Sequence, residues 1–177
     1  AGVAMLEDNV TISGIVWPSE YDYYQTCVAV HPTHHHRVAF KLTYDAPASA
    51  SGGTPNSGGT PNGNADLYIS TDTPRPTFDH STWLSTDKRY DYISIPTYVD
   101  DFLAAPTTRS GNGKVLHVGV YGRDGSGPAH NGPIAYSLTV MITNVEASEV
   151  RHRSSLRGGA QVPLPRDEIG SGDGSGD

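Results

Sequence analysis

The residues of this chain best suited to chemistry are oxygen-bearing side chains at the start of a strand-like segment. Asn62, Asn64 and Asp66 stand at alternate positions, and this spacing lets amide and carboxylate oxygens surround a hard cation such as calcium. The segment lacks the glycine and the distal glutamate of an EF-hand loop, and calcium takes roughly six to eight oxygens. A plain turn rich in Asn and Asp is the alternative, in which Asp66 bonds to the backbone.

Histidines form a second group with metal-binding potential. Four of them surround the Pro32-Thr33 pair of a predicted hairpin: His31, His34, His35 and His36. Strand alternation puts His34 and His36 on one face and His35 on the other. Because zinc needs about three or four convergent ligands held by surrounding residues, we expect a solvated polar turn here instead of a metal site.

Catalytic motifs are weak in this sequence. Gly125-Ser126-Gly127 departs from the Gly-x-Ser-x-Gly pattern, because residue 124 is Asp. The Asp100-Asp101 pair lies in a predicted loop with no apolar pocket to separate the two pKa values. No window shows a capped helical period, so no glycine-rich loop leads into a helix that could bind phosphate. We therefore expect a protein that is not an enzyme and has no cofactor, with calcium as the one ion to consider.

Composition limits the partners. The net charge of −7 gives no basic surface for nucleic acid or anionic membranes. Apolar runs are only a few residues long, so we expect no membrane insertion. The chain opens on Ala1 without a charged and apolar leader, which suggests a processed or excised form.

The elements that must position these residues are strands. Val38 to Tyr44 alternates strictly between apolar and polar side chains, and Ile134 to Ile142 repeats this pattern. Val115 to Tyr121 is more apolar, and Gly119 within it marks a close approach of backbone. Weaker patterns cover residues 10–16 and 90–95. Turn residues separate these runs, so the sequence predicts an all-β fold, a jelly-roll-like antiparallel β-sandwich of roughly seven or eight strands.

Two segments lie outside the strand pattern. Residues 46–63 form an insertion rich in Gly, Pro, Ser and Thr with a duplicated hexapeptide, and we expect it to loop out of the sandwich. Residues 147–177 read as an extended tail whose Gly/Ser/Asp end resembles a linker to a longer parent polypeptide. The predicted sandwich domain is therefore residues 1–146.

Three kinds of predicted surface residue and a single cysteine accompany this organisation. Asn9 begins an Asn-x-Thr sequon that accepts an N-glycan in a secreted chain. Thr54 and Thr60 of the insertion suit O-glycosylation. Arginines of the tail could meet the acidic surface of a neighbouring copy: Arg151, Arg153 and Arg157. The single cysteine, Cys27, is expected to be a buried, inert thiol, with an intermolecular disulfide as the alternative.

An ordered series of short motifs runs through residues 9–145. It comprises Glu20-Tyr21-Asp22-Tyr23-Tyr24, Val38 to Tyr44, Ala65-Asp66-Leu67-Tyr68-Ile69-Ser70, Pro76-Thr77, Trp83-Leu84-Ser85, Asp91 to Ile95, Val118 to Gly122 and Tyr136 to Val140. This series resembles the bacterial pre-peptidase C-terminal (PPC) domain. The resemblance implies a secreted β-sandwich that acts beside another domain without catalysing a reaction, and some members of the family bind calcium. The 46–63 insertion and the long connections 99–113 and 123–133 depart from the pattern.

Two functions are consistent with these features. The first is a non-catalytic extracellular or cell-surface module that assembles with copies of itself or with domains of its parent protein, as in a glycosylated filament or matrix. The alternative is an accessory domain of a secreted hydrolase or peptidase that binds carbohydrate or matrix with the help of calcium. Seven aromatic residues are expected to pack mainly in the core, and any that are exposed could stack on sugars: Trp17, Tyr21, Tyr23, Tyr24, Trp83, Tyr90 and Tyr92.

Overall fold

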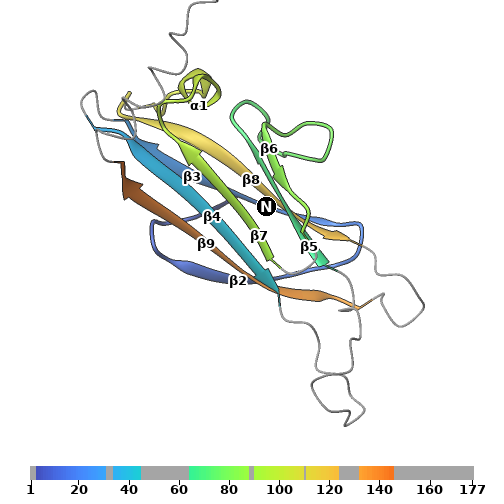
Figure 1. The fold of residues 1–177 in the computed structure, drawn as a ribbon. Helices are drawn as coiled ribbons and strands as arrows, with labels where there is room; N and C mark the ends of the chain where they lie inside the picture. Colours follow the sequence, from blue (N-terminus) through green and yellow to red (C-terminus); the bar gives the residue numbers. More distant parts are fainter. Residues whose placement is uncertain are drawn as a thin grey trace, which may run out of the picture. The chain divides into compact units, whose positions relative to one another are not determined.

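A computed structural model describes residues 3–30, 34–44, 64–87, 90–109, 111–123 and 132–145. These residues form two β-sheets that pack as a sandwich (Figure 1). Sheet A contains, in spatial order, β1 (Ala4–Met5), β3 (Tyr21–Ala29), β8 (Gly113–Arg123), β5 (Asn64–Ser70) and β6 (Trp83–Ser85). Sheet B contains β2 (Thr11–Val16), β9 (Ile134–Asn144), β4 (His36–Tyr44) and β7 (Tyr90–Pro96).

All pairings are antiparallel except that of β1 with β3. The predicted all-β sandwich is therefore confirmed, with β1 and β6 as short additional strands at the two edges of sheet A. None of the described residues belongs to a helix long and apolar enough to cross a membrane.

The core forms as the alternation predicts. Phe40 and Leu42 of β4, Leu138 and Val140 of β9, and Leu67 and Ile69 of β5 are all 0% exposed and belong to one apolar cluster between the sheets. Burial of these side chains supplies the main driving force for folding, since each Å² of apolar surface removed from water stabilises the folded state by about 25 cal/mol.

A polar link also joins the two sheets. The Tyr136 hydroxyl, on the inner side of sheet B, donates to Asp22 Oδ2 of sheet A at 2.7 Å and shares a hydrogen bond with the Tyr24 hydroxyl. Its ring lies against Gly14, where a Cβ atom would overlap the ring. The glycine therefore makes room for the tyrosine that bridges the sandwich.

Strand β5 is buried on both faces. Its inward residues enter the core, while the outward Asn64, Asp66, Tyr68 and Ser70 are also at most 8% exposed. The connection from β5 to β6, residues 71–82, contributes to this cover, because Phe78 lies edge-on to the Tyr68 ring at a centroid distance of 6.5 Å. This connection is called the β5–β6 loop below.

One short helix, α1 (Asp100–Ala104), interrupts the connection between β7 and β8. The expectation that Asp100 and Asp101 lie in a loop is therefore wrong, because they form the first turn of this helix. A helix of five residues is too short to show a 3.6-residue period, and most of its stability comes from burying Phe102 in the core. The sequence pattern consequently gave no sign of it.

Cys27 is exposed, so the expectation of a buried thiol is wrong. Its neighbours in β3, Thr26 and Val28, are 2% and 0% exposed and face the core. Because successive side chains of a strand point to opposite faces, Cys27 must face outward. Cys27 is followed by the apolar residues Val28, Ala29 and Val30, so the sequence shows no alternation between apolar and polar side chains at this point.

The chain divides into two units, Ala1–Val145 and Glu146–Asp177. Every described residue belongs to the first unit. The predicted insertion at 46–63 and the predicted tail at 147–177 lie outside the described residues.

Candidate functional site

The outer face of sheet A carries a cluster of four tyrosines from three strands: Tyr21, Tyr23, Tyr68 and Tyr121. The Tyr21 and Tyr23 rings are stacked with centroids 5.6 Å apart, and Tyr21 lies 4.6 Å from Tyr121. Tyr68 contacts Tyr21 and Tyr121 at 6.1 and 6.4 Å. The strand register brings these tyrosines together. Tyr21 pairs with Tyr121 across β3 and β8. Asp66 pairs with Tyr121 across β5 and β8, and Tyr68 follows Asp66 by two residues, so it lies on the same face.

The tyrosine cluster supports the β5–β6 loop. The Phe78 backbone forms a hydrogen bond with the Tyr21 hydroxyl, and this bond opposes the rise that burial causes in the pKa of Tyr21. The Arg75 guanidinium lies over the Tyr23 ring at 5.7 Å, a cation–π contact. The Pro76 carbonyl oxygen lies 2.7 Å from the point where a Cβ on Gly119 would be. The close backbone approach predicted at Gly119 is thus confirmed, and the loop rests on the sheet at that point.

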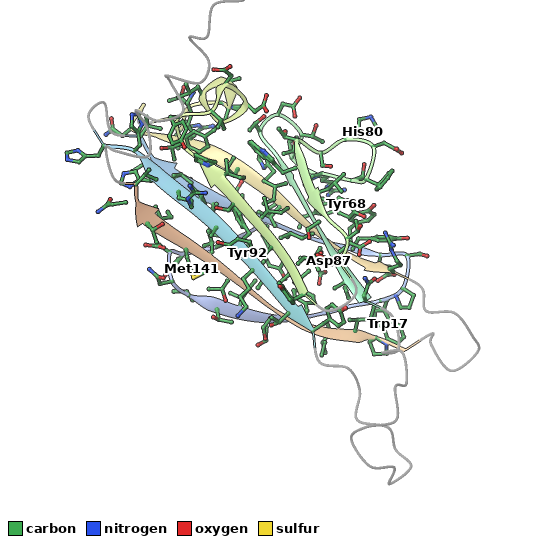
Figure 2. The ribbon with its side chains drawn as sticks, viewed as in Figure 1. Trp17, Tyr68, His80, Asp87, Tyr92 and Met141 are labelled. Carbon is green, nitrogen blue, oxygen red and sulfur yellow. The ribbon has the colours of Figure 1, made fainter. Side chains whose placement is uncertain are left out.

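The tip of this loop is an ordered turn that displays an apolar side chain. The His80 backbone N–H donates to the Thr77 carbonyl at 3.2 Å, and the Thr77 hydroxyl lies 3.4 Å from His80 Nδ1. Phe78, inside this turn, is 58% exposed. Asp79 and His80 are also exposed, and Figure 2 shows His80 at the outer end of the loop. Such a rigid, exposed aromatic residue with charged neighbours is suited to binding a partner.

Trp17 adds a second exposed aromatic group at one end of sheet A. It is 52% exposed and lies in the turn between β2 and β3 (Figure 2). Its carbonyl oxygen approaches Gly122 so closely that a Cβ there would overlap it. The turn is thereby fixed against the end of β8, and Trp17 is held by ordered backbone.

Most of the aromatic residues that were expected in the core lie elsewhere. Among the seven aromatic residues that were expected mainly in the core, Tyr24 and Trp83 pack against it. Trp17, Tyr90 and Tyr92 are exposed, and Tyr21 and Tyr23 belong to the outer tyrosine cluster. Phe78 and Arg75 were not singled out as site residues from the sequence. Only the neighbouring Pro76-Thr77 motif was noted there.

Asp66 does not lie in a turn, contrary to the expectation for this residue. It is the third residue of β5, 0% exposed, and its Oδ2 accepts from Arg123 Nη2 at 2.7 Å and from the Tyr68 hydroxyl at 3.3 Å. Burial raises the pKa of Asp66, and the Arg123 charge opposes that rise. The same carboxylate contributes, after burial, to raising the pKa of Tyr68.

The other predicted calcium ligands divide between described and undescribed parts of the chain. Asn64 is buried beside Asp66 in β5, whereas Asn62 lies outside the described residues. Among the described residues no group of three or more His, Cys, Asp or Glu could hold a metal ion. His34, His35 and His36 belong to that part of the chain, and the His35 ring lies edge-on to Tyr98 at 5.6 Å.

The remaining predicted residues are placed as follows. Asn9 is exposed in a turn with φ of 59°, so the sequon asparagine is accessible from solvent. Thr54, Thr60, Arg151, Arg153 and Arg157 lie outside the described residues, as do Gly125-Ser126-Gly127.

A serine, an aspartate and a histidine do meet on the outer face of sheet A. Ser70 pairs with His117 across β5 and β8, and the Asp72 charge acts on the pKa of His117. However, the Ser70 hydroxyl donates to Asp72 Oδ1 at 2.7 Å and accepts from the Thr73 N–H at 3.0 Å. The serine is also 1% exposed. Its proton is thus directed to the carboxylate and not to the imidazole, which is not the arrangement that activates a nucleophile.

Compared with models of known protein families and with curated proteins, the chain matches none of them.

Proposed function

We propose that this chain is a non-catalytic, extracellular or cell-surface β-sandwich module that binds other protein chains, either copies of itself or neighbouring domains of a parent protein. The binding element is the turn at the tip of the β5–β6 loop. The observation that carries the proposal is the combination of 58% exposure of Phe78 with a loop backbone fixed by the tyrosine cluster.

Energetic reasoning supports this role for the loop. A large apolar side chain gains by leaving water when a partner covers it, and a loop that is already ordered loses little entropy on binding. Arg75 and Asp79 flank Phe78, so the surface carries both charge signs next to an aromatic anchor. That composition is typical of interface hot spots.

Sequence features support the extracellular setting. Asn9 offers an exposed sequon, and the ordered motifs between residues 9 and 145 resemble the secreted PPC domain. A filament or matrix subunit with glycosylated Thr54 and Thr60 is the finer form of this proposal.

The test is the association of the purified chain, measured by analytical ultracentrifugation over a range of concentrations. We expect multimers, and we expect Phe78→Ala to weaken their association at least tenfold. The matched control is Ile15→Ala, because Ile15 is 62% exposed on sheet B, away from the loop. A monomeric chain at all concentrations, together with no retention of parent-protein fragments, would contradict the proposal, as would equal effects of the two substitutions.

A carbohydrate- or matrix-binding accessory domain is the second candidate. The exposed rings of Trp17 and Phe78 favour it, since such rings can stack on sugars. Retention on a polysaccharide or collagen column that is lost in Trp17→Ala would distinguish this function from protein assembly.

A further inference from the structure

Sheet B ends, at one edge, in a long strand that has no outer neighbour among the described strands. This strand is β7, which pairs with β4 on its other side (Figure 1). The edge strands of sheet A are short, since β1 has 2 residues and β6 has 3, whereas β7 has 7. A short edge strand is one protection against pairing with another chain, and β7 lacks this protection.

Hydrogen bonds at the end of β7 establish which of its backbone groups face outward. The Thr97 N–H donates to the His36 carbonyl at 2.9 Å, so these two residues form a hydrogen-bonded pair. In an antiparallel ladder such pairs alternate with pairs that exchange no hydrogen bond, and the register of β4 with β7 continues without a break. Every second residue of β7 therefore bonds to β4, and the others point their N–H and C=O groups away from the sheet. These outward groups belong to Tyr90, Tyr92 and Ser94.

The pairing of β4 with β9 has the opposite phase, as a strand inside a sheet requires. The Val145 N–H donates to the His35 carbonyl at 2.9 Å, so residues 37, 39, 41 and 43 of β4 bond to β9 and residues 38, 40 and 42 bond to β7. Within the described part of the chain, no hydrogen bond satisfies the outward backbone groups of β7. The edge is thus ready to accept a further strand.

The residues with outward backbone groups also present their side chains on the outer face of sheet B. Tyr90 and Tyr92 are 55% and 49% exposed, while the intervening Asp91 is 0% exposed. The edge therefore offers backbone hydrogen bonds and two aromatic rings at the same positions. Cross-strand contacts between aromatic side chains stabilise a sheet, and covering the rings removes apolar surface from water.

Charge does not oppose the approach of two copies along this edge. The outward residues of the four strands of sheet B include no acid, and the charged ones, Arg37 and Lys41, belong to β4, one strand behind the edge. If sheet B continued into the same sheet of a second copy, the two β4 strands would lie about 14 Å apart, because neighbouring strands are spaced by about 4.8 Å. This distance exceeds the Debye length of about 8 Å at physiological ionic strength. The edge can therefore pair despite the net charge of −7.

We infer that β7 pairs antiparallel with β7 of a second copy, with the two-fold axis at Tyr92. Tyr92 then faces its own counterpart, Tyr90 faces Ser94 of the second copy, and each pair exchanges both N–H···O bonds. Pro96 favours this register, because its nitrogen also points outward and has no hydrogen to donate, so a shift that pairs Pro96 loses a bond. Both copies use the same edge, so the association closes at a dimer.

Strand β2, at the opposite edge of sheet B, is less suited to this pairing. Its outward side chains are Thr11, Ser13 and Ile15, which supply no aromatic ring. Gly14 lies between them, and a glycine inside a strand weakens it. Thr11 also completes the sequon of Asn9, so a glycan there would stand beside this edge. The two edges therefore provide matched positions for a test.

The first experiment measures dimerisation of the full chain by sedimentation equilibrium. Tyr92→Lys should raise the Kd of the dimer at least about tenfold, because it places like charges opposite each other at the two-fold axis. Ile15→Lys is the matched control, since it makes the same change in charge at a residue of β2 that is 62% exposed on the same sheet. It should change Kd by less than about twofold. Equal effects of the two substitutions, or an unmodified chain that is monomeric at every concentration, would overturn the inference.

Disulfide cross-linking tests the register and does not depend on an added charge. Cys27→Ser first removes the exposed free thiol. In this background Tyr92→Cys should form an intermolecular disulfide, because the Cα atoms of a hydrogen-bonded antiparallel pair lie about 5.5 Å apart, within the range of a disulfide. Ile15→Cys in the same background should cross-link at least about tenfold more slowly. Equal rates, or no cross-link through Tyr92→Cys, would exclude the proposed register.

The edge contact deepens the proposed function and rests on its association between copies, but it uses a surface other than the β5–β6 loop. The two assignments therefore fail separately. Multimers that weaken in Phe78→Ala but not in Tyr92→Lys would overturn the edge contact and leave the proposed function intact. A dimer that weakens in Tyr92→Lys but not in Phe78→Ala would support the edge contact and contradict the loop as the binding element.

Discussion

At the residue scale, Asp91 links burial to the pH dependence of stability. Burial, and then the charges of Asp66 and Asp87, raise the pKa of Asp91 to about 6, against the hydrogen bonds from Ser85 and Asp87. An aspartate in an unfolded chain has a pKa of about 3.9, so the folded state binds this proton more tightly. The resulting stabilisation is fully present below about pH 4 and is lost as the pH rises to about 6.

The Asp91→Asn variant tests this dependence. The unmodified chain should lose at most about 3 kcal/mol through Asp91 between pH 4 and pH 6, and the variant should lack this contribution. Urea unfolding at a series of pH values measures both chains. Asp66 acts with the same sign and His117 with the opposite sign, but both remain in each chain, so the difference isolates Asp91. Parallel pH profiles would show that Asp91 does not titrate in this window.

A second residue-scale prediction concerns the hydroxyl of Tyr136. Tyr136→Phe removes the donor to Asp22 Oδ2 and the partner of the Tyr24 hydroxyl, and leaves both groups half-buried without their bond. We expect a loss of about 1 to 3 kcal/mol in the free energy of unfolding, measured with urea. Tyr92→Phe is the matched control, because Tyr92 is 49% exposed, and it should change stability by less than about 0.5 kcal/mol. Equal losses in the two variants would contradict the bridging role.

At the element scale, the position of the β5–β6 loop depends on Gly119. A Cβ at this position would meet the Pro76 carbonyl oxygen at 2.7 Å, so Gly119→Ala must displace the loop or the strand. We expect a loss of about 1 to 3 kcal/mol in the free energy of unfolding and faster hydrogen exchange in residues 71–82. Gly132→Ala is the control, because a Cβ there meets nothing within 4 Å. Unchanged exchange in Gly119→Ala would show that the loop does not rest on this contact.

The strands were predictable because each carries its own alternation. Val38 to Tyr44 shows period two without reference to any other segment, and one face of such a strand must be buried for the chain to fold. The outward face of β5 was not predictable in the same way. Asp66 and Ser70 are polar and alternate with apolar residues, which reads as a solvent face. Their burial depends on a loop and on strand partners that are distant in the sequence.

The same reasoning explains which site residues the sequence could and could not identify. Asn64 and Asp66 were predicted as ligands only because they are close together in the chain. The tyrosine cluster was not predicted, because its members come from β3, β5 and β8, and only the pairing of these strands brings them together. Local spacing therefore finds sites built from one segment, whereas sites built from several strands require the three-dimensional arrangement.

At the scale of the whole molecule, the interior and the outer surface of the sandwich have different tasks. The apolar core holds the two sheets together, and the outer face of sheet A supports the β5–β6 loop. A net charge of −7 means that copies of the chain repel one another at long range, so association needs local positive charge. The arginines at positions 151, 153 and 157 are candidates for that charge.

The double variant Arg151→Ser/Arg153→Ser should therefore weaken self-association, because it removes cations that can meet the acidic surface of another copy. We expect a decrease of about threefold to tenfold at low ionic strength, with a smaller difference at about 1 M salt, where the Debye length falls to about 3 Å. Sedimentation equilibrium measures both conditions. Lys41→Ser/Arg109→Ser is the control, since it makes the same change in net charge at two exposed residues of the sandwich unit. An equal decrease in the control would indicate that net charge, and not the tail arginines, governs assembly.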